Sequence, residues 1–108
     1  MKQPIKSGVE LIAEERARQI NAEGWTPQHD DEHTMAELSF AARAYLGHAI
    51  GTQFGTAVKT TVPGEWPWAA KWWKPSGIAE RDLIKAGALI AAEIDRLNRA
   101  QERTEAQE

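Results

Sequence analysis

The chain has 108 residues, of which 42% are hydrophobic and 27% are charged, a composition typical of one globular domain. Its formal net charge is −3 and its pI is about 5.6, so it lacks the overall basic character of a protein that binds duplex nucleic acid. It contains no cysteine, which excludes a disulfide framework, a thiolate metal site and a cysteine nucleophile.

The first predicted helix begins at Ser7. The segment Ser7-Gly-Val-Glu10 has the form of a capping box, in which the side chains of Ser7 and Glu10 bind free backbone N–H groups. Apolar residues then recur at helical spacing (Val9, Ile12, Ala13, Ala17 and Ile20). Gly24 is the expected end, because glycine adopts the left-handed conformation that terminates many helices. The polar segment from Trp25 to His33 is expected to be an ordered loop.

The second predicted helix runs from about Met35 to about Ile50. Thr34-Met-Ala-Glu37 has the form of another capping box, and an alanine-rich apolar face follows it at helical spacing. From Gly51 to Pro63 the helical period fails, and we expect a loop with at most one short extended piece. Together with the tryptophan-rich segment after it, this makes an unusually long connection, which in a compact domain is typically functional.

The last predicted helix follows Ser76, which can cap it. Its apolar residues alternate steps of four and three and are expected to face the core (Leu83, Gly87, Ile90, Ile94 and Leu97). Glycine in mid-helix costs roughly 1 kcal/mol relative to alanine, so we expect a close neighbour at Gly87. The predicted fold is an all-α, three-helix single domain over residues 1–100, with a long tryptophan-rich ordered crossover loop and a polar tail at 101–108. Because three short helices make a small core, we expect either that the tryptophans complete it or that a homo-oligomer shares it, and a homo-oligomer is among the predicted partners.

Four of the five tryptophans lie between Trp66 and Trp73, in the segment WPWAAKWWKPSG, interleaved with lysines. Indole rings stack on nucleobases, and lysine or arginine side chains neutralise phosphates. The alternative is that the tryptophans fill the core and the lysines solvate its rim. On the first interpretation, the predicted ligand-binding residues are Trp25, His29, His33, Trp66, Lys71, Trp72, Trp73, Lys74, Arg81 and Lys85.

Two acidic groups are candidate metal sites. The first comprises His29, Asp30, Asp31, His33 and Glu37, whose spacing matches no defined metal motif and which also suits negative charge at a helix start. The second is a carboxylate cage for Mg²⁺ (Glu10, Glu14, Glu15, Glu37, Asp82, Glu93 and Asp95), for which the pyrophosphohydrolase signature is missing. No phosphate loop and no serine-histidine-acid arrangement is apparent. We therefore expect no bound metal, no cofactor and no catalytic residues.

Three segments of the chain, EERARQINAEGWTPQHDDEH, WPWAAKWWKP and RDLIKAGALIAAEIDRL, resemble a family of small proteins from tailed phages and prophages. The resemblance implies a phage origin and a cytoplasmic setting in an infected bacterium, and carries no activity with it. A second resemblance is to the ryanodine-receptor repeat (RyR) domain, through Gly24-Trp25-Thr26 and the Arg81-Asp82 pair before the last helix. This second resemblance implies that the chain binds a nucleotide-derived ligand.

The sequence therefore favours a cytoplasmic, non-enzymatic phage accessory protein that binds a nucleotide-type small molecule and sequesters a host immune signal. One alternative is a metal-dependent nucleotide pyrophosphohydrolase that uses the acidic residues. The other is a protein-binding module for a host protein, with an exposed tryptophan surface. The N-terminus has no hydrophobic signal core and no apolar run is long enough for a membrane span, so we expect no membrane partner.

Overall fold

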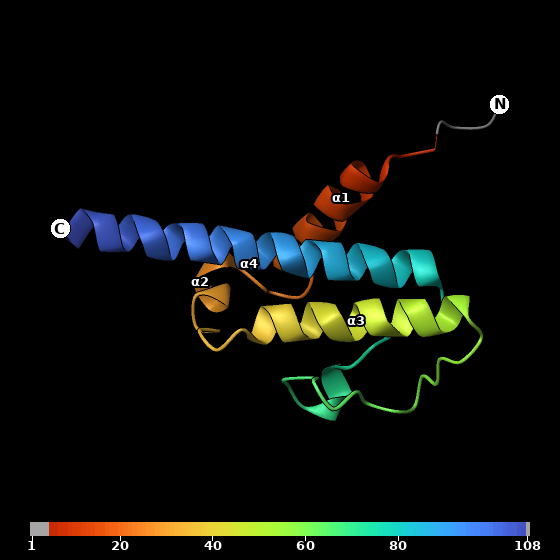
Figure 1. The fold of residues 1–108 in the computed structure, drawn as a ribbon. Coiled ribbons are helices and arrows are strands. Elements are labelled where there is room, and N and C mark those ends of the chain that lie inside the picture. The colour runs from red at the N-terminus through yellow and green to blue at the C-terminus, as the bar shows by residue number, and fades with distance from the viewer. Residues whose placement is uncertain (1–4, 108) are drawn as a thin grey trace.

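The computed structural model describes residues 5–107, and all regular structure in that range is helical (Figure 1). Its elements are α1 (Gly8–Asn21), α2 (Pro27–Asp30), α3 (Glu37–Gln53), the 3₁₀ turn η1 (Ala70–Trp72) and α4 (Ala79–Gln107). The all-α prediction is confirmed, although the described residues form four α-helices and not three. None of these helices combines the length and the apolar character needed to cross a membrane.

The predicted start of α1 is confirmed in atomic detail. The backbone N–H of Glu10 donates to Ser7 Oγ at 3.2 Å, and the Glu10 carboxylate accepts from the Ser7 backbone N–H at 3.3 Å. This reciprocal capping box satisfies two N–H groups that the first turn leaves free. The helix ends at Asn21, earlier than predicted, although Gly24 does adopt a left-handed φ of 74°.

Two predictions between residues 25 and 37 are wrong. The segment expected to be a loop contains the single turn α2, because Thr26 accepts a bond from the His29 N–H and Pro27 occupies the first helical position. The capping box at Thr34 does not form. Instead α3 begins at Glu37 after a left-handed Ala36 (φ 62°), and the Glu37 carboxylate binds the Met35 N–H.

The core lies mainly between α3 and α4, which run antiparallel and side by side (Figure 1). Alanines let the helices approach closely, since Ala41, Ala49 and Ala92 are fully buried. Two tryptophans of the connection between α3 and α4, Trp66 and Trp73, pack on α3 and complete this core. The tryptophan-rich connection is therefore ordered against the helices, and part of it is the 3₁₀ turn η1.

The predicted core stripe of α4 is wrong, apart from its glycine. Leu83, Ile90, Ile94 and Leu97 are each 41–53% exposed. The helix buries a neighbouring face against α3 instead, made of small, apolar and paired polar residues (Asp82, Ala86, Leu89, Ala92, Glu93 and Arg96). Sequence periodicity could not reveal this, because Glu93 is buried only by virtue of its partners Arg96 and Ser39. α4 also continues as helix through the polar residues 101–107.

Gly87 has the close neighbour that its position predicts. A Cβ atom there would lie 2.6 Å from Cδ1 and 2.9 Å from Cγ1 of Ile12, so α1 crosses α4 where no side chain intervenes. Gly47 in α3 is a matched comparison, because a Cβ there would meet nothing within 4 Å.

Alanine substitutions at Gly47 and at Gly87 should therefore change the free energy of unfolding differently. Gly47→Ala should raise the free energy of unfolding by about 0.5–1 kcal/mol through backbone entropy and helix propensity. Gly87→Ala should gain less, or lose stability, because the Ile12 side chain must move. Urea unfolding of both variants measures the difference, and an Ile12→Ala background should abolish it. Equal gains at both positions in the parent background would contradict the close contact.

Candidate functional site

Two adjoining pockets lie where α1, α4 and the tryptophan-rich connection meet. The polar pocket, of about 320 Å³, is lined by Glu15, Arg18, Gln19, Glu23, Trp25, Tyr45, Trp72, Lys74, Arg81, Lys85 and Leu89. The aromatic pocket, of about 460 Å³, is lined by Glu23, Gly24, Trp25, His29, Asp30, His33, Leu38, Trp68, Ala69 and Trp72. The two share Glu23, Trp25 and Trp72, and each has a volume in the range of small-molecule sites.

A buried carboxylate organises the polar pocket. Glu15 is only 2% exposed, and its two oxygens each accept a bond of 2.8 Å from the Arg18 guanidinium. Arg81 of α4 donates to the same carboxylate, which ties α1 to α4. Burial acts to raise the pKa of Glu15, but the hydrogen bonds from Arg18 and Arg81 outweigh it and hold the pKa below its ordinary value. The carboxylate is therefore ionised and fixes both guanidinium groups.

Gln19 leaves one polar atom of the pocket without a partner. Its Nε2 donates to Glu15 at 3.3 Å, which fixes the orientation of the amide. Its Oε1 is buried and has no hydrogen-bond partner, although the side chain lines the polar pocket. An unpaired buried acceptor is costly, so this oxygen is suited to a donor brought by a ligand.

Positive charge predominates in the polar pocket, which has four cationic and two acidic lining residues. Arg18 uses its guanidinium on Glu15 and Glu23, whereas Arg81 has a single bonded nitrogen and Lys74 Nζ lies 5.6 Å from the Trp72 ring centre. Lys85 donates to the Lys74 carbonyl at 2.7 Å, and burial lowers its pKa. The pocket therefore combines available cations with an exposed indole.

Aromatic rings form one wall of the second pocket. Trp25 and Trp68 have ring centres 6.0 Å apart, and His33 lies 5.2 Å from Trp68. The backbone holds Trp25 in place: its N–H donates to the Gln19 carbonyl at 2.9 Å, and its own carbonyl accepts from Arg16 at 3.2 Å.

Asp30 also lines the aromatic pocket, where it is buried and pairs with Arg16. Burial raises the pKa of Asp30 despite the attraction of Arg16, because removal from water disfavours the charged form. The carboxylate therefore serves as an anchor for the Arg16 guanidinium, which in turn positions the Trp25 backbone.

Comparisons of the chain with family models, curated proteins and solved structures found no match. The resemblances to phage proteins and to the RyR domain therefore stay predictions.

The ten predicted ligand residues fall into three groups. Seven line the pockets: Trp25 and Trp72 both of them, Lys74, Arg81 and Lys85 the polar one, and His29 and His33 the aromatic one. Trp66 and Trp73 are in the core, where both pack against Tyr45. Lys71 lines neither pocket and lies 5.1 Å from the Trp72 ring centre.

Several residues of the site were not among the predicted ligand-binding residues, namely Arg18, Gln19, Trp68 and Glu15, the last of which was a candidate metal ligand instead. Glu15 and Arg18 had the spacing of an ordinary surface ion pair on one helix, and only the contact from Arg81 distinguishes them. Nothing in the sequence marked Gln19, since its role depends on burial.

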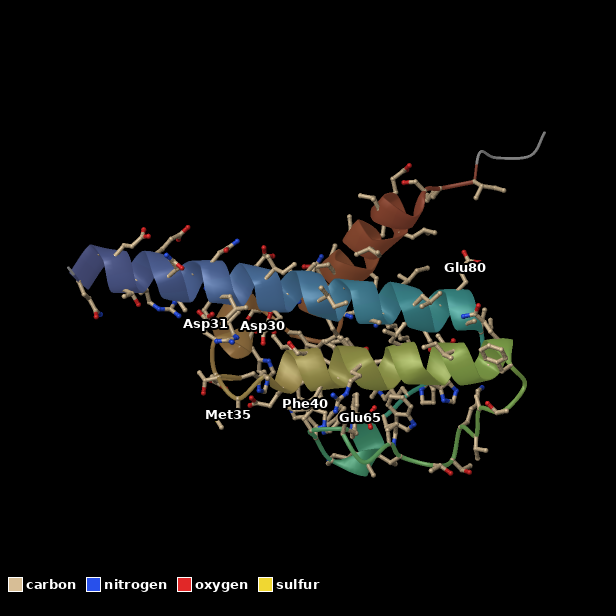
Figure 2. The ribbon with its side chains drawn as sticks, in the orientation of Figure 1. Asp30, Asp31, Met35, Phe40, Glu65 and Glu80 are labelled. Atoms are coloured by element: carbon tan, nitrogen blue, oxygen red, sulfur yellow. The ribbon has the colours of Figure 1, made fainter. Side chains whose placement is uncertain are left out.

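Several of the acidic candidates for metal ligands are engaged elsewhere. Asp31 accepts bonds of 3.0 and 2.8 Å from Arg99, and both it and Asp30 lie on the α2 side of α4 (Figure 2). Glu37 binds the Met35 N–H and lies 3.4 Å from His33 Nδ1. Within residues 5–107 no three histidine or carboxylate side chains converge as a metal site would require.

The buried Glu15 contacts lead to a stability prediction. Glu15→Gln should lower the free energy of unfolding at pH 7 by about 2 kcal/mol, because charge-assisted hydrogen bonds to two arginines are lost. Since the folded pKa of Glu15 is depressed, its contribution is present above the ordinary carboxyl range and disappears as the pH falls through the folded pKa. The difference between wild type and variant should therefore shrink on acidification.

Urea unfolding at pH 7 and at pH 3 measures both effects. Glu14→Gln is the matched control, since Glu14 is an exposed carboxylate that pairs with Lys6 at the surface. It should cost less than about 1 kcal/mol. A Glu15→Gln cost as small as that of Glu14→Gln would show that the buried cluster does not stabilise the fold.

Proposed function

We propose that this protein binds a nucleotide-derived small molecule in the groove formed by the polar and aromatic pockets. The observation that carries the proposal is the juxtaposition of Lys74, Arg81 and Lys85 with the indoles of Trp25 and Trp72 in one pocket. A nucleotide offers both features that this pocket would recognise, a phosphate anion and a planar base.

The layout of the groove suggests how such a ligand would lie. Its phosphate would meet Lys74 and the unbonded nitrogens of Arg81, at the rim of the polar pocket. Its base would stack on Trp25 or Trp72, which line both pockets, and extend toward Trp68 and His33. The ligand would replace water over the apolar faces of the rings, which adds a hydrophobic contribution to the electrostatic one.

Binding without turnover is the favoured activity. Metal-dependent hydrolysis of a nucleotide needs carboxylates free to hold a divalent cation, and two buried carboxylates of the groove are committed to arginines: Glu15 to Arg18 and Arg81, and Asp30 to Arg16. In the phage setting that the sequence resemblance implies, a binding protein of this kind would act by sequestering a host nucleotide signal.

The chain offers a matched pair of lysines with which to test the site. Lys71 and Lys74 both lie over the Trp72 ring, but only Lys74 lines the polar pocket. Trp72→Ala should weaken nucleotide binding by about 1–3 kcal/mol, the usual value of base stacking on an aromatic side chain. Lys74→Ala should weaken it and reduce its dependence on salt, because a contact between opposite charges is lost. Lys71→Ala should leave the affinity unchanged.

Quenching of tryptophan fluorescence by a panel of mononucleotides and cyclic dinucleotides, confirmed by calorimetry, measures these affinities. Trp72 is 46% exposed, so its removal should leave the fold intact, which circular dichroism can check. A protein that binds no member of the panel, or equal losses at Lys71 and Lys74, would overturn the assignment. The protein-binding alternative would then be preferred.

Gln19 gives a second test of the same pocket. Gln19→Leu keeps the volume of the side chain but removes the unpaired acceptor, so it should weaken the tightest ligand of the panel by roughly tenfold. Measuring a ribonucleotide and its 2′,3′-dideoxy counterpart shows whether a sugar hydroxyl is the donor, because only then does the loss disappear for the dideoxy form. Unchanged affinity of the ribonucleotide would place the ligand away from Gln19.

A further inference from the structure

One face of α4 is apolar and about half exposed; on this side, only Gly87 is covered, by Ile12 of α1. Leu83, Ile90, Ile94 and Leu97 are spaced by seven, four and three residues, which places them on a single side of the helix. Each is about half exposed, whereas the neighbouring faces are buried against α3 and α1. Beyond the crossing of α1 at Gly87, Ile90, Ile94 and Leu97 have the spacing of the seam between two helices of a coiled coil.

The apolar face continues onto α3. Ser39 donates to Glu93 at 3.3 Å, which places this side of α3 against the edge of the α4 stripe, because Ile90 and Leu97 flank Glu93 by three and four residues. Leu46 and Ile50 follow Ser39 by seven and eleven residues, so they share its side of α3, and both are exposed. We define the apolar face as Leu46, Ile50, Leu83, Ile90, Ile94 and Leu97.

The shape of the molecule indicates that a large surface remains to be covered. The chain exposes 7188 Å², whereas a compact monomer of 12.0 kDa exposes about 6,000 Å². Its radius of gyration is 15.3 Å against about 13 Å for a compact domain of this length, and it is only 22 Å thick along its shortest axis. Part of the excess belongs to the projecting C-terminal turns of α4 (Figure 1). The whole excess of exposed area over that of a compact monomer is larger than the roughly 800 Å² per partner that a standard interface removes.

We propose that a second copy of this chain covers the apolar face, with α4 packed against α4 about a two-fold axis. A two-fold interface brings the same patch of each copy together, and the six residues that define this face are uncharged. Arg43, on the same side of α3, lies over the Phe40 ring. Two identical helices with coiled-coil spacing also have apolar seams of the same period, so the seams can pack against each other. The dimer does not depend on ligand binding.

Sedimentation equilibrium of the full-length chain without ligand tests the dimer directly. The wild type should sediment at twice the 12.0 kDa of one chain, with a dissociation constant in the micromolar range or below. Ile90→Glu and Ile94→Glu should each sediment as folded single chains, because two carboxylates would be buried in the interface. Val9→Glu is the matched control: Val9 is an 80% exposed aliphatic residue of α1, outside the face, and its variant should remain a dimer.

Cross-linking keeps the proposal testable if the glutamate variants fail to fold. The chain has no cysteine, so Ile94→Cys and Val9→Cys each introduce the sole thiol. A short bismaleimide cross-linker should convert Ile94→Cys, but not Val9→Cys, to a covalent dimer. A wild type that remains a single chain at millimolar concentration, a dimer that survives both glutamate substitutions, or equal cross-linking at both positions would overturn the proposal.

Discussion

The thinness of the α3–α4 interface is the constraint on which the rest of the structure depends. Alanines occupy much of both facing surfaces, including Ala41 and Ala49 of α3 and Ala86 and Ala92 of α4. Such an interface lets two backbones approach closely but buries little apolar area, so the pair needs further cover to be stable. Trp66 and Trp73 supply it from the connection between the helices, and their burial is the reason that a connection of this length is ordered.

Ordering of the connection in turn creates the candidate site. With Trp66 and Trp73 fixed against α3, the residues between and after them are held close to α1 and α4. Trp72 stays half exposed because Trp73 takes the core position, and Lys74 follows where its backbone N–H can donate to the Tyr45 hydroxyl at 3.3 Å. The same segment thus serves as core and as pocket wall, so the alternatives raised by its sequence are both realised in different residues.

Buried ion pairs hold the other wall. Glu15 and Asp30 are both removed from water, and ion pairs with arginine compensate for the lost hydration. Removing either partner of a pair would therefore leave an uncompensated buried charge. Their pKa values respond differently: two guanidinium groups bind Glu15 and keep its pKa low, whereas burial dominates at Asp30 and raises its pKa. The two carboxylates consequently oppose each other in the dependence of stability on pH, since acidification weakens the first contribution and relieves the cost of the second.

The sequence predicted what depends on local interactions and failed where distant partners decide. The Ser7 capping box and the close contact at Gly87 follow from residues within one element or from the absence of a side chain, and both are present. The predicted Thr34 cap does not form because the Glu37 carboxylate binds the Met35 N–H instead. Both arrangements use the same neighbouring residues, so the sequence does not distinguish them. The buried face of α4 could not be predicted at all, since Glu93 and Asp82 read as surface residues until their partners are known.

α4 buries a partly polar face and leaves its most apolar stripe exposed, which explains how one helix could both line the groove and form a dimer seam. Arg81 and Lys85 lie on the side of α4 that meets the polar pocket, and at 100° per residue they point almost opposite to Ile90 and Ile94. A helix that buried its most apolar stripe in its own core would have turned Arg81 and Lys85 toward solvent, away from Glu15 and the tryptophans. By burying Asp82, Leu89 and Glu93 instead, α4 presents cations to the groove on one side and an apolar seam on the other. In a two-fold dimer built on that seam, the two grooves would face outward and remain open to ligand.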